Sequence, residues 1–207
     1  VIAVTGSVGK ASTIGMLQVM LAGQGKCHAP ASRYRNRLEV PLCFATLPQD
    51  ADFAVVKIGA RQSGDIGKLA RLAQPHAAIV TRVASEHLGA FGSLHAIATE
   101  KATIFAGLVA GGAAIFRGDD SCAAQMRADI GTAREISFGG AGNDWALGPV
   151  RLGRDVTVVM ANGVGQDYLF KLAVPGRHFA MNALGALAAV TAIGCDPVTA
   201  TLDLAQW

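Results

Sequence analysis

The chain has 207 residues, of which 51% are hydrophobic and 16% charged; this composition excludes a disordered segment and predicts a globular protein with a substantial core. Its formal net charge of +3 is small and its Lys and Arg residues form no single run, so charge gives no reason to expect a nucleic-acid partner. The longest run without charge, from Phe179 to Cys195, is short for a membrane span and contains Asn182. We expect a buried helix there and no membrane partner.

Four cysteines are spread along the chain without a CxxC pair: Cys27, Cys43, Cys122 and Cys195. This spacing disfavours a zinc site, and the apolar surroundings of most of them favour free, buried thiols in a reducing compartment. The first residues, VIAV, form a strand-like run rather than a secretory signal. Together these features predict a cytoplasmic protein. A strand at the first residue also suggests that an upstream domain lies outside this chain.

Apolar runs alternate with helical patterns as far as Gly139, which is typical of βαβ units. Strands are predicted at 1–4, 53–58, 77–83, 112–116 and 135–138. Helices are predicted at 11–22, 66–72 and 93–108, and Ser93 is a suitable N-cap for the last of these. The expected fold is therefore an α/β domain of the P-loop type, with a mostly parallel sheet flanked by helices and strand 1–4 in a central position.

The pattern changes after Gly139. Two strand-like runs, 155–160 and 167–174, flank an Asn-Gly turn signal at 162–163, which predicts a small antiparallel β-hairpin attached to the domain. A helix is predicted at 178–193, and Asp196 followed by Pro197 begins a last helix. Because no repeat, linker or low-complexity segment interrupts the chain, residues 1–207 are expected to form one domain.

Residues 5–13, TGSVGKAST, lie between a predicted strand and a predicted helix and are the strongest local signal. A glycine-containing turn at a helix N-terminus directs backbone N–H groups and the positive end of the helix dipole at an anion, and Lys10 adds a cation. The full GxxxxGK[ST] pattern is not met, because Val4 stands at its first Gly and Ala11 at its Ser or Thr. On this pattern alone the segment is either a phosphate site or an ordinary strand–turn–helix connection.

Six segments, in order along nearly the whole chain, resemble motifs of the central domain of the Mur ligases, most closely the type that adds D-alanyl-D-alanine. The family's shortened phosphate loop, which also lacks the first Gly, matches VIAVTGSVGKAST. The pattern GN-aromatic-NNxxGVPL aligns with SRYRNRLEVPL, and a strand ending in E-hydrophobic-GA and followed by GEI aligns with DFAVVKIGARQSGDI. The patterns ITNVGPAHLExFGS, AxAKxxIFxGL and GRHNxxNALAAxAA are similar to IVTRVASEHLGAFGS, ATEKATIFAGL and GRHFAMNALGALAA. Such a series is highly specific.

The resemblance implies an ATP-dependent ligase fold that forms amide bonds in peptidoglycan precursor synthesis. Such enzymes pass the γ-phosphate of ATP to a substrate carboxylate, and an amine then attacks the acyl phosphate. It also implies an N-terminal substrate domain and a C-terminal domain outside this chain, which in the family hold much of the uridine nucleotide substrate and of the incoming amine.

The family's site residues can be carried over only where the motifs align. The residues that would cradle phosphates are Gly6, Ser7, Gly9, Lys10 and Ser12. His87 matches a metal-ligand histidine, and Lys101 matches a lysine that is carbamylated in several members and helps to hold a second magnesium. His178 and Asn182 match residues near the nucleotide base. Plainer interpretations remain open, with His87 as a helix cap or cleft-mouth residue and Lys101 as an exposed lysine on a helix.

The departures from the family pattern fall where the chemistry should be. Ala11 removes a magnesium-binding hydroxyl, and Lys57 replaces the glutamate that would serve the metal. Arg82 and Arg35 each replace an asparagine, and Phe179 replaces another near the base. Magnesium prefers oxygen ligands and supports phosphoryl transfer, while added cations oppose its binding. We therefore expect a nucleotide such as ATP, or another phosphate-bearing ligand, bound without magnesium, and no ligase or ATPase activity from the chain alone.

Three functions stay open at this point. The chain is a catalytically impaired Mur-like domain that binds a nucleotide or another anion, in support of flanking domains or an active partner protein; or a working amino-acid ligase with altered metal use; or a structural or interaction domain without a ligand. The added basic residues likewise have two explanations. Lys57 and Arg82, with Arg35, replace the metal as phosphate ligands, or they reflect drift in a cleft that no longer catalyses.

Overall fold

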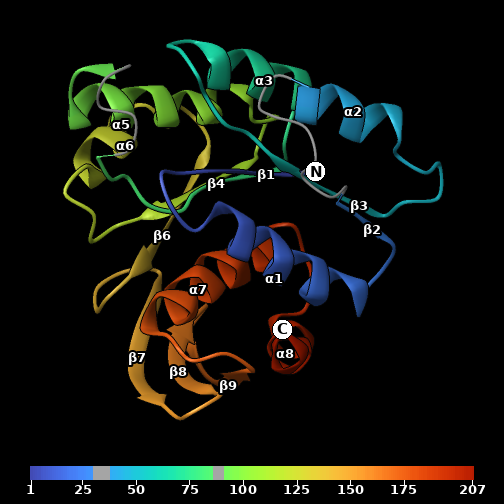
Figure 1. The fold of residues 1–207 in the computed structure, drawn as a ribbon, viewed down its shortest axis with the longest axis vertical. Coiled ribbons are helices and arrows are strands. Elements are labelled where there is room, and N and C mark those ends of the chain that lie inside the picture. Colours follow the sequence, from blue (N-terminus) through green and yellow to red (C-terminus); the bar gives the residue numbers. More distant parts are fainter. Residues whose placement is uncertain (30–37, 86–90) are drawn as a thin grey trace.

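The computed structural model describes residues 1–29, 38–85 and 91–207 of the chain. Within these ranges a nine-stranded sheet crosses the molecule in the order β2-β3-β1-β4-β5-β6-β7-β8-β9 (Figure 1). Neighbouring strands from β2 to β7 are parallel, whereas β7 with β8 and β8 with β9 pair antiparallel. The predicted α/β fold, with a mostly parallel sheet, an interior first strand and an antiparallel hairpin at one end, is confirmed.

The strands are β1 (Ile2–Thr5), β2 (Cys27–His28), β3 (Phe53–Lys57), β4 (Ala77–Val80), β5 (Ala113–Arg117), β6 (Arg134–Gly139), β7 (Trp145–Leu152), β8 (Thr157–Gly163) and β9 (Gln166–Leu172). The helices are α1 (Lys10–Ala22), α2 (Glu39–Ala45), α3 (Asp65–Ala73), α5 (Leu94–Ala102), α6 (Ala123–Ala128), α7 (Arg177–Ala192) and α8 (Pro197–Asp203), with 3-10 turns η2 (Thr103–Gly107) and η3 (Leu204–Gln206).

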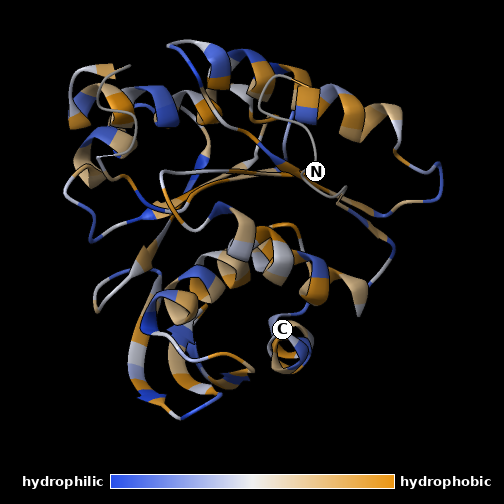
Figure 2. Ribbon diagram, in the orientation of Figure 1, coloured by the Kyte–Doolittle hydropathy of each residue, from blue (hydrophilic) through white to orange (hydrophobic). Residues whose placement is uncertain are grey.

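Helices cover both faces of the sheet and create two separate hydrophobic cores. Successive residues of a strand point to opposite faces, so Ile2 and Val4 of β1 belong to one core and Ala3 to the other. Helices α1, α7 and α8 pack on the first face, and α2, α3, α5 and α6 lie on the second (Figure 1). The apolar residues accordingly lie on the strands and on the inward sides of the helices (Figure 2).

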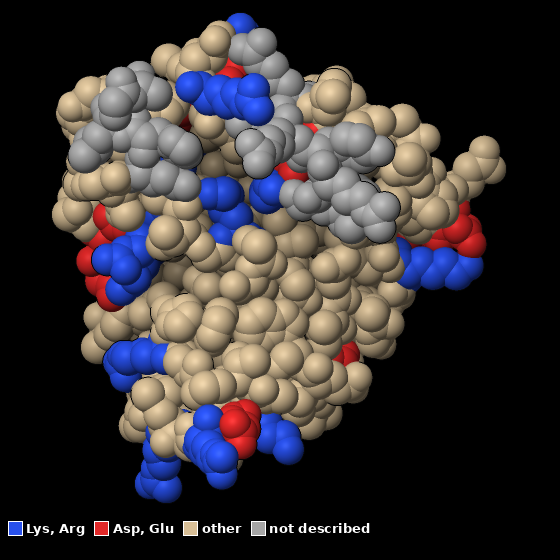
Figure 3. Space-filling model, in the orientation of Figure 1, with Lys and Arg blue, Asp and Glu red and all other residues tan. Residues whose placement is uncertain are grey.

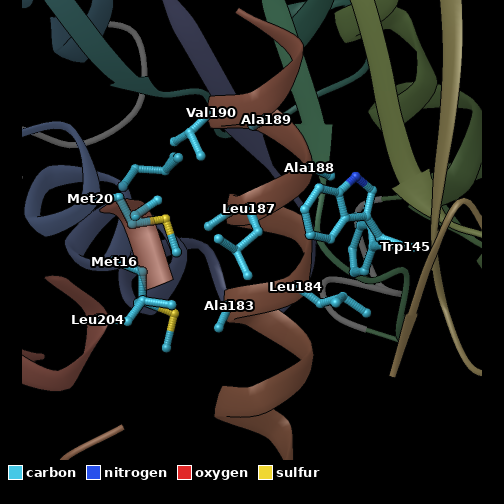
Figure 4. Close-up of a cluster of buried hydrophobic side chains, with 14 of the residues drawn as sticks. Met16, Met20, Trp145, Ala183, Leu184, Leu187, Ala188, Ala189, Val190 and Leu204 are labelled. Atoms are coloured by element: carbon cyan, nitrogen blue, oxygen red, sulfur yellow. The ribbon is translucent and has the colours of Figure 1, made fainter. Parts of the chain in front are cut away.

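Helix α7 packs closely between α1 and the sheet because its sequence is rich in small residues. Gly185 faces the ring of Phe138 so closely that an added β-carbon would come within 3.0 Å of the ring. Leu187 points toward Met16 and Met20 of α1, and Leu184 lies on the other side of α7, toward Trp145 (Figure 4). This packing fixes the N-terminal part of α7 beside the start of α1, where the predicted phosphate loop lies.

Several elements differ from the sequence predictions for identifiable reasons. The predicted strand at 77–83 ends at Val80, and the predicted helix at 93–108 changes to a 3-10 turn at Thr103. Strand β7 was not predicted, because Pro149 and a register shift between Leu147 and Val150 interrupt the alternation of apolar and polar residues. Elements β2, α2 and α6 were also missed, since each is too short to show a period. In the described part of the chain, no helix is long and apolar enough to cross a membrane.

Candidate functional site

The carboxyl ends of three neighbouring strands meet at the loop between β1 and α1. Val4 pairs with Lys57 of β3, and Thr5 pairs with Val80 of β4. Ligands of open parallel sheets bind at this edge, where strands give way to loops and helix N-termini. The region predicted to bind phosphate therefore occupies a position suited to that task.

The loop itself, residues 6–9, needs glycine at two positions. Gly6 has a φ of 144° and Gly9, the residue before α1, has a φ of 90°. The ammonium of Lys10 lies back over the loop and donates hydrogen bonds to the carbonyl oxygens of Gly6 and Ser7, the latter at 2.9 Å. These bonds hold the lysine at the mouth of the loop, where an anion would meet both the cation and the N-terminus of α1.

The segment after β4 is bonded to the same loop. The Thr81 hydroxyl donates to the Val8 carbonyl at 2.6 Å, and the Ser7 backbone N–H donates to the Arg82 carbonyl at 2.7 Å. The Ser7 hydroxyl donates to the Ala84 carbonyl at 2.9 Å and accepts from the Ala84 N–H at 3.0 Å. Ser7 is buried and these atoms are engaged inside the protein, so the loop is rigidly braced by residues 81–84.

Helix α7 provides the opposite wall of the site. Asn182 lies against Gly9, and His178, which is exposed, packs on the ring of Phe179 with ring centroids 4.0 Å apart. Phe179 in turn meets Trp207 edge-on at 5.2 Å. Aromatic rings at the start of α7 offer a surface on which a nucleotide base can stack. The structure therefore brings Asn182 to the loop and places His178 on the same helix, one turn nearer its N-terminus.

Lys57, at the end of β3, forms an ion pair with Glu39 at the start of α2. Its Nζ lies 2.7 Å from Oε1 of Glu39, and the two side chains are 24% and 8% exposed. Figure 3 shows Lys and Arg atoms gathered in the middle of one face, over the loop that joins β1 to α1. Ser12 is half-buried in the first turn of α1, and Arg82 is exposed on the segment after β4.

Lys101 lies on α5 next to a carboxylate that organises a neighbouring helix. Glu100 is 4% exposed and accepts hydrogen bonds from the N–H groups of Gly64 at 2.6 Å and Ile66 at 2.9 Å. Asp65 accepts from the N–H groups before it, those of Arg61 and Gln62. Lys101 itself is half-buried rather than exposed. Its predicted carbamylation stays a prediction.

Two positions that would serve magnesium in the family pattern carry other residues here. Ala11 offers no hydroxyl, and Lys57 presents an ammonium where an oxygen ligand is expected. Among residues 1–29, 38–85 and 91–207 no group of three His, Cys, Asp or Glu side chains could hold a metal. Two predicted residues, the metal ligand His87 and the basic Arg35, lie outside the described residues.

Sequence reasoning missed Glu39, Thr81 and Glu100. Glu39 could have been found from the sequence, because it stands where the GN-aromatic-NNxxGVPL pattern has the Gly before VPL. Thr81 and Glu100 could not, since a hydroxyl or carboxylate that binds backbone groups of a distant segment leaves no local sequence pattern. Thr81 braces the phosphate loop, Glu39 pairs with Lys57, and Glu100 holds the start of α3.

Comparisons with known proteins agree with this geometry. A family model described as the Mur ligase middle domain matches residues 4–190. The chain is 31% identical over 205 residues to the UDP-N-acetylmuramoyl-tripeptide–D-alanyl-D-alanine ligase of Bacillus subtilis, covering 99% of the chain and 44% of that protein. It is 34% identical over 208 residues to the Escherichia coli protein of the same name, covering 98% and 44%. A crystal structure of MurF from Acinetobacter baumannii superposes with a TM-score of 0.95 at 28% identity, over 99% of this chain and 45% of that one. The chain thus spans less than half the length of these relatives.

Proposed function

Because the chain belongs to the Mur ligase middle-domain family, we propose that it is the nucleotide-binding domain of a Mur ligase-like protein and that it has lost the family's magnesium-dependent phosphoryl transfer. ATP is the proposed ligand, since the family's reaction consumes it. The proposed phosphate-binding residues are Gly6, Gly9, Lys10 and Ser12, together with the backbone N–H groups at the start of α1.

Nucleotide binding is supported by three features that the substitutions have left in place. The loop keeps its two positive-φ glycines, Lys10 keeps its position at the loop mouth, and Asn182 lies beside Gly9. The N–H dipoles at the start of α1 and the ammonium of Lys10 lie at the same loop, so a phosphate would bind to a preorganised site. Ser7 supports the loop from inside through its bonds to Ala84.

The main support for the proposed loss of catalysis is the ion pair between Lys57 and Glu39 at the end of β3. A carboxylate at position 57 would attract a metal ion, whereas Lys57 repels it and is itself engaged by Glu39. Ala11, two residues past the last loop glycine, removes the hydroxyl that would complete the metal site. Phosphoryl transfer depends on cations that neutralise charge on the transferring group, and Lys10 alone is a poor replacement for them.

Flanking domains are part of the proposal, because the relatives are more than twice as long as the matched region. The relatives are named as ligases of UDP-N-acetylmuramoyl-tripeptide and D-alanyl-D-alanine. We infer that the longer protein acts on, or supports the enzymes that act on, precursors of this kind in the cytoplasm.

A chimera tests the proposal most directly. This chain would replace the matching domain of the E. coli ligase, which then supplies both flanking domains and known substrates. We expect the chimera to bind ATP saturably in calorimetry and to release no ADP above background when D-alanyl-D-alanine is added. ATP binding by the chimera shows that inactivity is not misfolding. ADP release that depends on the amine and is abolished by Lys10→Ala would refute the loss of catalysis, and absence of any ATP binding would refute the nucleotide site.

A further inference from the structure

Lys57 and Glu39 are both departures from the family pattern, and they touch each other. In the aligned motifs position 57 is Glu and position 39 is Gly, so the chain carries a new cation and a new anion. They lie on different elements, at the last residue of β3 and the first residue of α2, and are 18 positions apart in sequence. The 2.7 Å contact between Nζ and Oε1 joins the two substitutions into one structural change.

Each substitution alone would be unfavourable here. Lys57 without Glu39 would lose a carboxylate at 2.7 Å from an ammonium group whose side chain is only 24% exposed. Glu39 without Lys57 would bury a carboxylate, 8% exposed, beside the family's glutamate at position 57. Two carboxylates in contact repel and one of them must take up a proton, whereas an opposite pair stabilises both charges. The two residues are therefore expected to depend strongly on each other.

We propose that the Lys57–Glu39 pair takes the structural place of the metal: it neutralises the end of β3, fixes the start of α2 against it, and makes ligand binding at the loop indifferent to magnesium. On this account Lys57 is a positioning residue that is engaged by Glu39 rather than a phosphate ligand. Anion binding then depends on Lys10 and the N-terminus of α1. Magnesium-independent binding rests on the proposed nucleotide site, whereas the mutual stabilisation of Lys57 and Glu39 does not.

A double-mutant cycle tests the pair without any ligand. The variants are Lys57→Met, Glu39→Gln, the double variant Lys57→Met/Glu39→Gln and the reversed pair Lys57→Glu/Glu39→Lys, each followed by thermal unfolding of the 207-residue chain. Each single variant is expected to lower Tm by about 4 °C or more, and the double variant by much less than the sum. The exposed pair Arg127–Glu135 is the control, and the same cycle there is expected to show shifts of about 1–2 °C. Additive effects at positions 57 and 39 would overturn the proposal.

A second experiment tests the role of magnesium by comparing the ATP affinity of the chain in EDTA and in magnesium. Wild type is expected to change by less than about threefold, and Ala11→Thr likewise, because position 57 still presents an ammonium instead of the family's carboxylate ligand. The variant Ala11→Thr/Lys57→Glu/Glu39→Gly, which restores the family residues, is expected to gain about tenfold or more in magnesium. A similar gain in Ala11→Thr alone would show that the missing hydroxyl, not the pair, excludes the metal. If no variant binds ATP, the proposed function fails, and the structural role of the pair is then decided by the thermal cycle.

Discussion

Asn182 of helix α7 lies so close to Gly9 that a β-carbon added to Gly9 would come within 2.7 Å of the Asn182 side-chain oxygen. Gly9 also has a φ of 90°, a conformation that other residues adopt only at a cost. The backbone conformation and the Asn182 contact both disfavour a β-carbon at Gly9, the residue before α1. The contact ties the position of α7 to the shape of the phosphate loop.

Gly9→Ala should therefore destabilise the fold more than a glycine substitution that meets only the backbone constraint. Gly64, which precedes α3 with a φ of 84° and has no atom within 4 Å of an added β-carbon, is the matched control. We expect Gly64→Ala to cost about 1–2 kcal/mol in unfolding free energy and Gly9→Ala at least about 1 kcal/mol more. Urea unfolding measures both. Equal losses, or no relief of Gly9→Ala when Asn182→Ala is added, would mean that the contact does not constrain the loop.

Removing the Thr81 hydroxyl should loosen the phosphate loop. Thr81→Val keeps the shape of a buried residue but deletes the hydroxyl that donates to the Val8 carbonyl at 2.6 Å and lies 3.2 Å from the Thr5 carbonyl, at a cost of about 1–2 kcal/mol. Thr99→Val is the control, because Thr99 is exposed and its hydroxyl donates to His95 of its own helix and accepts only from the Gln125 side chain, and it should cost less than about 0.5 kcal/mol. Chemical denaturation compares the two. A Thr81→Val chain as stable as Thr99→Val would argue against a bracing role.

Glu100→Gln should destabilise the start of α3. The carboxylate accepts two backbone N–H bonds with its two oxygens, while the amide of Gln has only one oxygen to offer. We expect a loss of about 1.5–3 kcal/mol, typical of a buried bond to a charged group. Glu135→Gln, in the exposed pair with Arg127, is expected to lose at most about 1 kcal/mol. Hydrogen exchange at Gly64 and Ile66 should accelerate in Glu100→Gln alone, and unchanged exchange there would contradict the assignment.

The thiols of Cys27 and Cys43 should react slowly while the chain is folded. Burial raises the pKa of each to about 11 from an ordinary value of 9.0, and Cys43 further raises the pKa of Cys27. A raised thiol pKa means less thiolate, so alkylation at pH 8 should be about 100-fold slower than in the unfolded chain. The folded rate should still climb between pH 9 and pH 11, where the unfolded rate levels off. Peptide mass spectrometry of iodoacetamide labelling measures both, and equal rates in the two states would contradict the prediction.

The elements that sequence predicted well are those whose causes are local. Ser93 was expected to cap a helix and accepts a hydrogen bond from the N–H of Ala96, and Asp196 caps α8 through Val198 and Thr199. The hairpin of β8 and β9 followed from the alternation of its two strands, but its turn is Val164-Gly165 and not the predicted Asn162-Gly163, which lies in β8. Each depends on residues within a few positions of one another.

What sequence missed depends on contacts between distant segments. The partner of Lys57 could not be named, because the pairing with Glu39 follows from where α2 begins relative to the end of β3. The bracing of the loop by Thr81 depends in the same way on how β4 lies beside β1. The family motifs did locate the positions of Lys10 and Asn182, since those residues retain the aligned pattern.

We expect a phosphate-bearing ligand to bind at the Lys10 loop without magnesium. The most direct measurement is a calorimetric titration of ATP into the 207-residue chain in EDTA, repeated in magnesium and with Lys10→Ala. We expect saturable binding in EDTA, an affinity that differs by less than about threefold in magnesium, and a loss of about tenfold or more in Lys10→Ala, because the lysine supplies a cation at the loop. Binding that requires magnesium, or the absence of binding in both buffers, would contradict the account.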